Sequence, residues 1–193
     1  MSQTLFKRTV EGDVIIELNI LALDQATTSG FAVFNYKDGK ASMLDYGKMK
    51  VEGKKYVEKI AGIKKWMIEI VEEYDIDAVV VEDVYYMRNA ATHKKLSGLL
   101  YVLVTWLYEN NIQFLVVTAS QWRSSSNIKG KGRTAKKKAS KKYVLDRFDI
   151  KVTNDESDAI LIGVHAIEQL NEYQWGEDAS SADIVFDIEN SSI

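Results

Sequence analysis

The stretch that decides the fold reads Val14-Ile15-Ile16-Glu17-Leu18-Asn19-Ile20-Leu21-Ala22-Leu23-Asp24-Gln25-Ala26-Thr27-Thr28-Ser29-Gly30. Its first ten residues are mostly apolar and rich in branched side chains, which predicts a long strand over 14–23. The strand ends at Asp24, and a polar turn follows. A carboxylate at the end of a buried strand loses hydration, so a partner must compensate for it. Asp24 is therefore a candidate functional residue, with a simple turn-starting acid as the common alternative.

The rest of the chain predicts an α/β domain. Further strands are expected over 30–36, 41–47, 77–82 and 113–118, and Asp38-Gly39 predicts a hairpin between the first two of these. Amphipathic patterns predict helices over 54–74, 89–108, 134–148 and 154–173. The segment 119–133, with its serines and glycines, is expected to be a loop. This layout predicts a mixed five-stranded sheet flanked by helices.

Three more acids stand at comparable places. Glu82 ends the apolar run 78–81, and Asp83 after it must point to the opposite face. Asp155 and Asp158 share one face of the last helix, whose start carries a capping box of Thr153 and Glu156. Asp155 taken singly is typical of an acid that complements a helix dipole. Carboxylates gathered within a few ångströms repel each other, and Mg²⁺ relieves such repulsion, so the set predicts a shared cation.

Length and composition limit the class of protein. A chain of 193 residues, 46% hydrophobic, is expected to form one domain with a substantial core. We expect an N-terminal extension over 1–13, the domain over 14–173, and an acidic, loosely ordered tail over 174–193. The absence of cysteine excludes disulfides and thiolate metal sites. The sequence has neither a signal peptide pattern nor an 18-residue apolar span, which predicts a soluble, cytoplasmic protein without a membrane partner.

Charge is unevenly distributed, although the net charge is only −3. Residues 123–142 contain nine Lys or Arg and no acid, whereas residues 171–193 contain six acids and no Lys or Arg. An ordinary solvated face is the simple interpretation of such a run. The density of positive charge favours contact with DNA phosphates instead. The expected DNA-binding residues of this segment are Lys129, Lys131, Arg133, Lys136, Lys137, Lys138 and Lys141, and Lys94 with His93 could extend the surface.

At this point the motifs resemble a known family. Leu23-Asp24-Gln25-Ala26-Thr27-Thr28-Ser29-Gly30 resembles the first motif of RuvC-type Holliday junction resolvases. The segment Val81-Glu82-Asp83-Val84-Tyr85-Tyr86-Met87-Arg88-Asn89-Ala90 is similar to their second motif, and Asn154-Asp155-Glu156-Ser157-Asp158-Ala159 to their closing helix. The motifs occur in the family's order. Gln25-Ala26 replaces the Pro-Gly that bacterial members usually have, which together with the short chain suggests the phage-encoded branch and the host cytoplasm.

The resemblance implies a ribonuclease H-like fold, a homodimer and Mg²⁺-dependent nicking of four-way DNA junctions, with Mn²⁺ as a substitute. By position, Asp24, Glu82, Asp155 and Asp158 match the catalytic, metal-binding acids of the family, which would hold two ions. Tyr85 matches an aromatic that contacts the junction centre, with plain core packing as the alternative. Arg88 and Asn89 of the same motif are expected to bind DNA as well.

Other functions stay open on the sequence alone. The run from Asp24 to Ser29 also resembles the phosphate loop of sugar and glycerol kinases, but those enzymes have two such domains and this chain has room for one. A non-catalytic DNA-binding protein of the same fold is a second alternative. A third is a broader nuclease that also cuts forks and three-way junctions, because little base-reading chemistry is evident. His165 is expected to be a satisfied core residue.

Overall fold

The computed structural model describes residues 8–175 except 11–12, 16, 27 and 86–88. Its centre is a five-stranded sheet in the order β5-β4-β3-β6-β7, and a separate two-stranded sheet pairs β1 with β2. The strands are β1 (Arg8–Val10), β2 (Asp13–Ile15), β3 (Glu17–Asp24), β4 (Thr28–Lys37), β5 (Lys40–Lys50), β6 (Ala78–Glu82) and β7 (Gln113–Val117). The helices are α1 (Tyr56–Glu73), α2 (Ala90–Glu109), α3 (Ala119–Ser125), α4 (Gly132–Phe148) and α5 (Asn154–Trp175).

The sheet is mixed, as the sequence predicts. β3 pairs antiparallel with β4 and parallel with β6, and β6 pairs parallel with β7. The β4–β5 hairpin turns at Asp38 and Gly39, whose φ angles of 45° and 80° are both positive. An Asp-Gly pair tolerates those angles, and such turns match the twist of the flanking strands.

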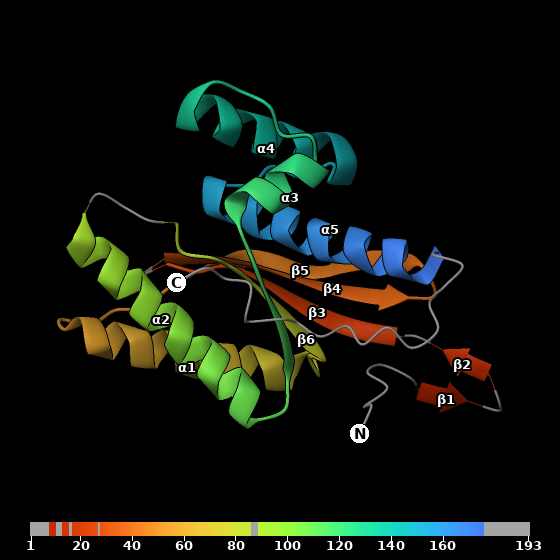
Figure 1. The fold of residues 1–193 in the computed structure, drawn as a ribbon, viewed down its shortest axis with the longest axis horizontal. Helices are drawn as coiled ribbons and strands as arrows, with labels where there is room; N and C mark the ends of the chain where they lie inside the picture. Colours follow the sequence, from red (N-terminus) through yellow and green to blue (C-terminus); the bar gives the residue numbers. More distant parts are fainter. Residues whose placement is uncertain (1–7, 11–12, 16, 27, 86–88, 176–193) are drawn as a thin grey trace.

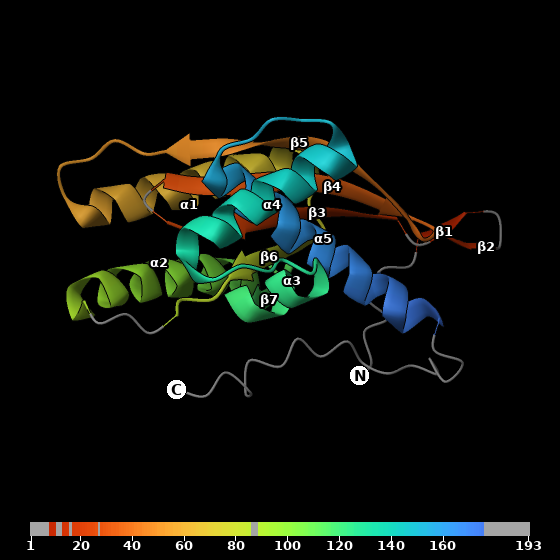
Figure 2. The same ribbon diagram turned by 90° about the horizontal axis from the view of Figure 1, so that it is seen from above.

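Helices cover both faces of the sheet. In Figure 1, α1 and α2 lie below the sheet, and α3, α4 and α5 lie above it. Two apolar clusters follow from this arrangement. Alternate β3 residues divide between them, with Leu21 and Leu23 packing toward α1 and α2, and Ile20 and Ala22 packing toward α5. Viewed from above in Figure 2, α4 crosses near α5 on the upper layer.

Two predicted elements differ from the structure. The single strand expected over 14–23 is divided, because β2 pairs with β1 whereas β3 begins at Glu17 opposite Lys37, the last residue of β4. The predicted boundary at residue 14 falls within β2, and the division into domains stays a prediction. The expected loop over 119–133 is wrong in its first half, which forms α3. The acidic tail lies outside the described residues beyond Trp175. Among the described helices, none is long and apolar enough to cross a membrane.

Candidate functional site

Strand geometry places Asp24 and Glu82 side by side. β3 and β6 run parallel with Leu23 opposite Val81, so the next residue of each strand is the acid. Ala22 and Val80 both pack toward α5, and side chains two apart on a strand share a face. The two carboxylates therefore emerge at the same end and on the same face of the sheet.

The start of α5 brings the other two acids to this end. Glu156 Oε2 accepts a hydrogen bond of 2.6 Å from the Thr153 backbone N–H, which confirms the Glu156 half of the predicted capping box. The helix comes very close to β4 here, because a Cβ built on Gly30 would lie 2.0 Å from the Asp155 carbonyl oxygen. Gly30 pairs with Asp24 across the sheet, so the bare backbone of this glycine lets α5 reach the acids.

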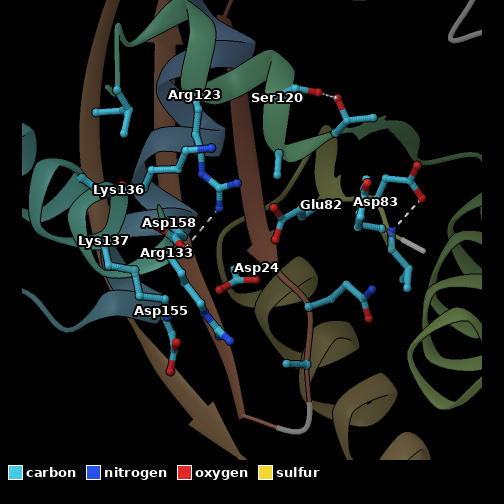
Figure 3. A pocket seen from close by; sticks show the side chains of 18 of the residues that line it. Asp24, Glu82, Asp83, Ser120, Arg123, Arg133, Lys136, Lys137, Asp155 and Asp158 are labelled. Carbon is cyan, nitrogen blue, oxygen red and sulfur yellow. Dashed lines mark hydrogen bonds and ion pairs between the residues drawn. The ribbon is translucent and has the colours of Figure 1, made fainter. Parts of the chain in front are cut away.

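These residues line a pocket of about 1010 Å³. Figure 3 shows the carboxylates of Asp24, Glu82 and Asp158 facing one space, with Asp155 at its edge. All four predicted acids belong to its lining, and so do Tyr85, Lys129, Arg133, Lys136 and Lys137. The pocket thus has an acidic floor and a basic wall, which comes from α3 and α4.

Burial makes the acidic floor reluctant to ionise. The pKa of Asp24 is raised well above its usual value, first by desolvation and then by the charge of Glu82 and a hydrogen bond to it. Desolvation also raises the pKa of Glu82, although the Asp24 hydrogen bond and the Arg123 charge oppose it. The hydrogen bond between the two carboxyls thus raises the pKa of Asp24 and lowers the pKa of Glu82.

Asp158 is the most buried of the four acids, with 5% of its surface exposed. Desolvation, followed by the charge of Asp24, raises its pKa to about 6. Arg123 moderates this rise, its Nη2 lying 4.0 Å from Asp158 Oδ2. The other oxygen, Oδ1, is buried without a hydrogen bond of good geometry, and the nearby Ser140 hydroxyl lowers the pKa of this carboxyl. Such an oxygen costs free energy unless a proton or a cation meets it.

The carboxylates of the pocket are suitable ligands for a divalent cation. Carboxylate oxygens are the ligands that Mg²⁺ prefers, and the orphaned Asp158 Oδ1 gives one of them an unmet need. Within the described part of the chain, however, no three acidic or imidazole side chains already converge on one coordination point.

The remaining predicted residues are placed differently. Tyr85 is 82% exposed, which rules out its alternative as a core aromatic. Asn89 caps α2, its side chain accepting from the Thr92 N–H at 3.1 Å. Four predicted DNA contacts, Lys94, Lys131, Lys138 and Lys141, are exposed but outside the pocket lining. Arg88 lies outside the described residues. His165 is buried and its Nδ1 meets Ser125 Oγ at 2.9 Å, as expected of a satisfied core histidine.

Sequence reasoning missed three pocket residues or supports. Arg123 was counted in the basic segment but not assigned to the site, because its segment was expected to be a loop. Trp122, next to it, donates its indole N–H to Glu82 Oε1 at 3.2 Å. Gln25 belongs to the pocket lining, is only 7% exposed, and has a side-chain Oε1 without a hydrogen-bond partner. The sequence did contain one signal for the helix that carries Trp122 and Arg123. Thr118-Ala119-Ser120-Gln121 is a capping-box pattern, and it marks the start of α3.

The mixed sheet, the acids at two adjacent strand ends and the acids on the last helix define an α/β domain of the ribonuclease H-like class. Solved structures share this fold. A RuvC of T. thermophilus in complex with a Holliday junction substrate aligns with a TM-score of 0.65 and 16% identity, covering 79% of this chain and 96% of that one. A Fowlpox virus resolvase, also with Holliday junction DNA, gives a TM-score of 0.56 and 16% identity, covering 79% and 99% of the two chains.

Sequence comparison places the chain more narrowly. The family model described as Crossover junction endodeoxyribonuclease RuvC matches residues 20–166. Curated proteins of that name are similar to this chain, with 25% identity in Alkaliphilus metalliredigens over 70% of this chain and 83% of the relative. In Caldicellulosiruptor saccharolyticus the identity is 22%, over 83% and 99% of the two chains. The chain belongs to the RuvC family.

Proposed function

We propose that this protein is a metal-dependent endonuclease that nicks branched DNA, with the four-way junction as its principal substrate. The observation that carries the proposal is the pocket itself, in which Asp24, Glu82 and Asp158 face one space beneath a basic wall. An acidic floor suits cations, and a basic wall suits the phosphates that would accompany them.

Asp24, Glu82 and Asp158, with Asp155 at the edge, are the residues that would hold Mg²⁺, or Mn²⁺ in its place, as two ions per site. Such ions would lower the pKa of a bound water and offset negative charge on the leaving oxygen of a phosphodiester. The chain supplies the rest. Asp24 and Glu82 share a proton that must leave before a cation binds, because ligand carboxylates are ionised.

Basic residues of the wall would position the DNA. Lys137 lies close enough to lower the pKa of both Asp24 and Asp158, so it is near any phosphate held above them. Arg133 and Lys136 line the same pocket. Tyr85, whose ring is exposed at the rim, could stack on an unpaired base at the junction centre.

Cutting two strands symmetrically requires two sites, so we also propose a homodimer. Support comes from α2, on which Tyr101 and Tyr108 are 57% and 73% exposed. Two tyrosines seven residues apart share a helix face, and exposed aromatics are enriched at interfaces. Such a nuclease would act in the cytoplasm, or in the host cytoplasm if a phage encodes it.

Cleavage of end-labelled synthetic DNA tests the proposal. We expect nicking of a four-way junction in Mg²⁺ or Mn²⁺, with little cutting of a linear duplex of the same sequence. Asp24→Asn should lower the rate at least ~1000-fold, about 4 kcal/mol of transition-state stabilisation. Asp146→Asn is the matched control, because Asp146 lies on α4, outside the pocket, and pairs with Lys142.

The alternatives give different results in the same experiment. Equal cutting of forks and three-way junctions would indicate the broader nuclease. Tight junction binding without a nick in either metal would indicate a non-catalytic DNA-binding protein. Transfer or hydrolysis of ATP phosphate without DNA cutting would indicate the kinase-like phosphotransferase.

A further inference from the structure

Trp122 lies at an unusual place for a tryptophan. Its side chain is completely buried in the cluster beneath α5. Large indole rings are rarely buried to this degree, and a buried indole N–H requires an acceptor. Here the acceptor is Glu82 Oε1, at 3.2 Å. A phenylalanine would keep much of this apolar contact without demanding a carboxylate oxygen, so the indole contributes a fixed donor as well as volume.

The neighbouring residue reaches a second acid. The guanidinium carbon of Arg123 lies 4.3 Å from the centre of the Trp122 ring, and its Nη2 lies 4.0 Å from Asp158 Oδ2. The contact with the indole keeps the guanidinium at this place, where its charge lowers the pKa of both Glu82 and Asp158. In Figure 3 Arg123 descends from α3 toward Asp158, with Glu82 on the other side of the space.

α3 is anchored firmly enough to serve as a support. Thr118 and Gln121 form a reciprocal capping box at its start. At its end, Ser125 Oγ contacts His165 Nδ1 of α5 at 2.9 Å. Thr118 directly follows β7 and Ser125 contacts α5, so both ends of α3 are fixed. The backbone that carries Trp122 and Arg123 is therefore held in place.

The hydrogen bond from the Trp122 indole occupies Oε1 of Glu82 and leaves Oε2 without a contact from the indole. Groups that donate hydrogen bonds to metal-binding carboxylates orient those carboxylates. Their removal typically weakens metal affinity by about one to two orders of magnitude. Arg123 acts in the opposite sense, since a fixed positive charge beside Asp158 repels a cation that approaches the same oxygens.

We propose that Trp122 and Arg123 are positioning residues of the acidic pocket: the Trp122 indole fixes Glu82 for a divalent cation, and Arg123 balances the charge of Asp158 until that cation binds. This inference rests on the proposed function, in that it takes the four acids as the cation site. It adds a short helix that sequence reasoning expected to be a loop, and it assigns opposite effects to two adjacent residues.

Mn²⁺ binding by the full chain without DNA, followed at pH 8 by the electron paramagnetic resonance of free Mn²⁺, tests the inference. Trp122→Phe should weaken binding by ~10-fold. Trp66→Phe is the matched control: Trp66 packs edge-on against Phe31 in the cluster below the sheet, and its replacement should change affinity less than ~2-fold. Arg123→Gln should strengthen Mn²⁺ binding by several-fold, because a competing charge is removed.

A double-mutant cycle separates positioning from plain packing. In a Glu82→Gln background, Trp122→Phe should change Mn²⁺ affinity less than ~2-fold, because the carboxylate that it orients is gone. Equal weakening in both backgrounds, or no weakening beyond that of Trp66→Phe, overturns the role of Trp122. Weaker binding by Arg123→Gln overturns the role of Arg123. Wild-type protein that binds no Mn²⁺ overturns the cation site and the inference together.

A measurement on folded wild-type protein covers the case in which Trp122→Phe fails to fold. The chain has four tryptophans, so replacement of Trp66, Trp106 and Trp175 in turn assigns the indole N–H resonance of Trp122 by elimination. Mg²⁺ should shift that resonance in wild-type protein but not in Glu82→Gln. Its failure to shift contradicts the inference even if junctions are cut, whereas a metal-dependent shift without any DNA cleavage contradicts the proposed function alone.

Discussion

At the scale of single residues, the pocket keeps carboxylates in surroundings that disfavour their charge. The unfolded chain ionises Asp158 near pH 3.8, whereas in the folded protein burial raises that pKa to about 6. Between these values the folded state binds a proton that the unfolded state has lost. The favourable contribution present below pH 3.8 is therefore lost as the pH rises through 6.

Asp158→Asn should accordingly stabilise the protein at neutral pH. About two pKa units correspond to about 3 kcal/mol, so we expect the variant to gain up to that amount in unfolding free energy at pH 7.5 and almost nothing near pH 3.5. Urea unfolding without divalent cations measures it. The control Asp146→Asn, an exposed acid, should differ from wild type by less than ~0.5 kcal/mol. A destabilised Asp158→Asn at pH 7.5 would contradict this account of the pocket.

Gly30 is the second residue on which the site depends. Gly30→Ala would place a methyl group against the Asp155 carbonyl group and the Glu156 nitrogen, and these backbone atoms cannot rotate away as a side chain would. We expect a loss of at least ~2 kcal/mol of stability and a large loss of nicking, since α5 must move away from β4. Thermal unfolding and junction cleavage measure the two effects.

Gly98→Ala is the natural comparison for that change. A Cβ at Gly98 meets nothing within 4 Å, and the residue lies inside α2. Replacement there should stabilise the protein by up to ~1 kcal/mol, because alanine has the higher helix propensity. Unchanged stability of Gly30→Ala would show that α5 tolerates a shift at its start.

At the scale of elements, periodicity predicted most of the fold. The apolar runs of β3 and β6 were enough to put Asp24 and Glu82 at strand ends, and the spacing of Asp155 and Asp158 was enough to put both at the start of α5. Their convergence followed from parallel pairing, which confirms the predicted mixed sheet. The strand predicted over 14–23 was too long, because its start in the sheet depends on where the partner strand β4 ends. No local sequence signal gives that position.

The element that sequence reasoning did not predict is α3. It has seven residues, too few for a helical period to emerge, and the serines after Arg123 favoured a loop. The Trp122–Glu82 hydrogen bond joins residues forty apart, which no periodicity can indicate. Such tertiary contacts decide which oxygens are held, and only coordinates reveal them.

At the scale of the whole molecule, the basic side chains that line the pocket lie on one face of the sheet. Arg123, Arg133, Lys136 and Lys137 gather on the α3–α4 side of the pocket, whereas α1 and α2 cover the opposite face. DNA bound over the acids would therefore meet one face only, and its affinity should depend on salt.

Single substitutions can locate that face. In an Asp24→Asn background, which prevents cutting, Lys136→Gln should reduce the slope of log affinity against log salt concentration by ~1 for four-way junctions. Lys65→Gln on α1 should leave the slope unchanged, since this lysine pairs with Glu69 on the far side of the sheet. Fluorescence anisotropy of labelled junctions gives both slopes. Equal slopes for the two variants would place the DNA elsewhere.

The way in which the pocket is assembled has a consequence for the newly made chain. Asp24 lies near the start of the sequence and Asp158 near the end of the described fold, and α5 packs against both β3 and β4. Synthesis proceeds from the N-terminus, so β3 and β6 emerge with two of the acids long before α5 brings the other two. The proposed cation site is complete only when α5 has packed against the sheet. A partly made chain therefore lacks two of the four acids. It should not cut the cell's own DNA until α5 has packed against the sheet.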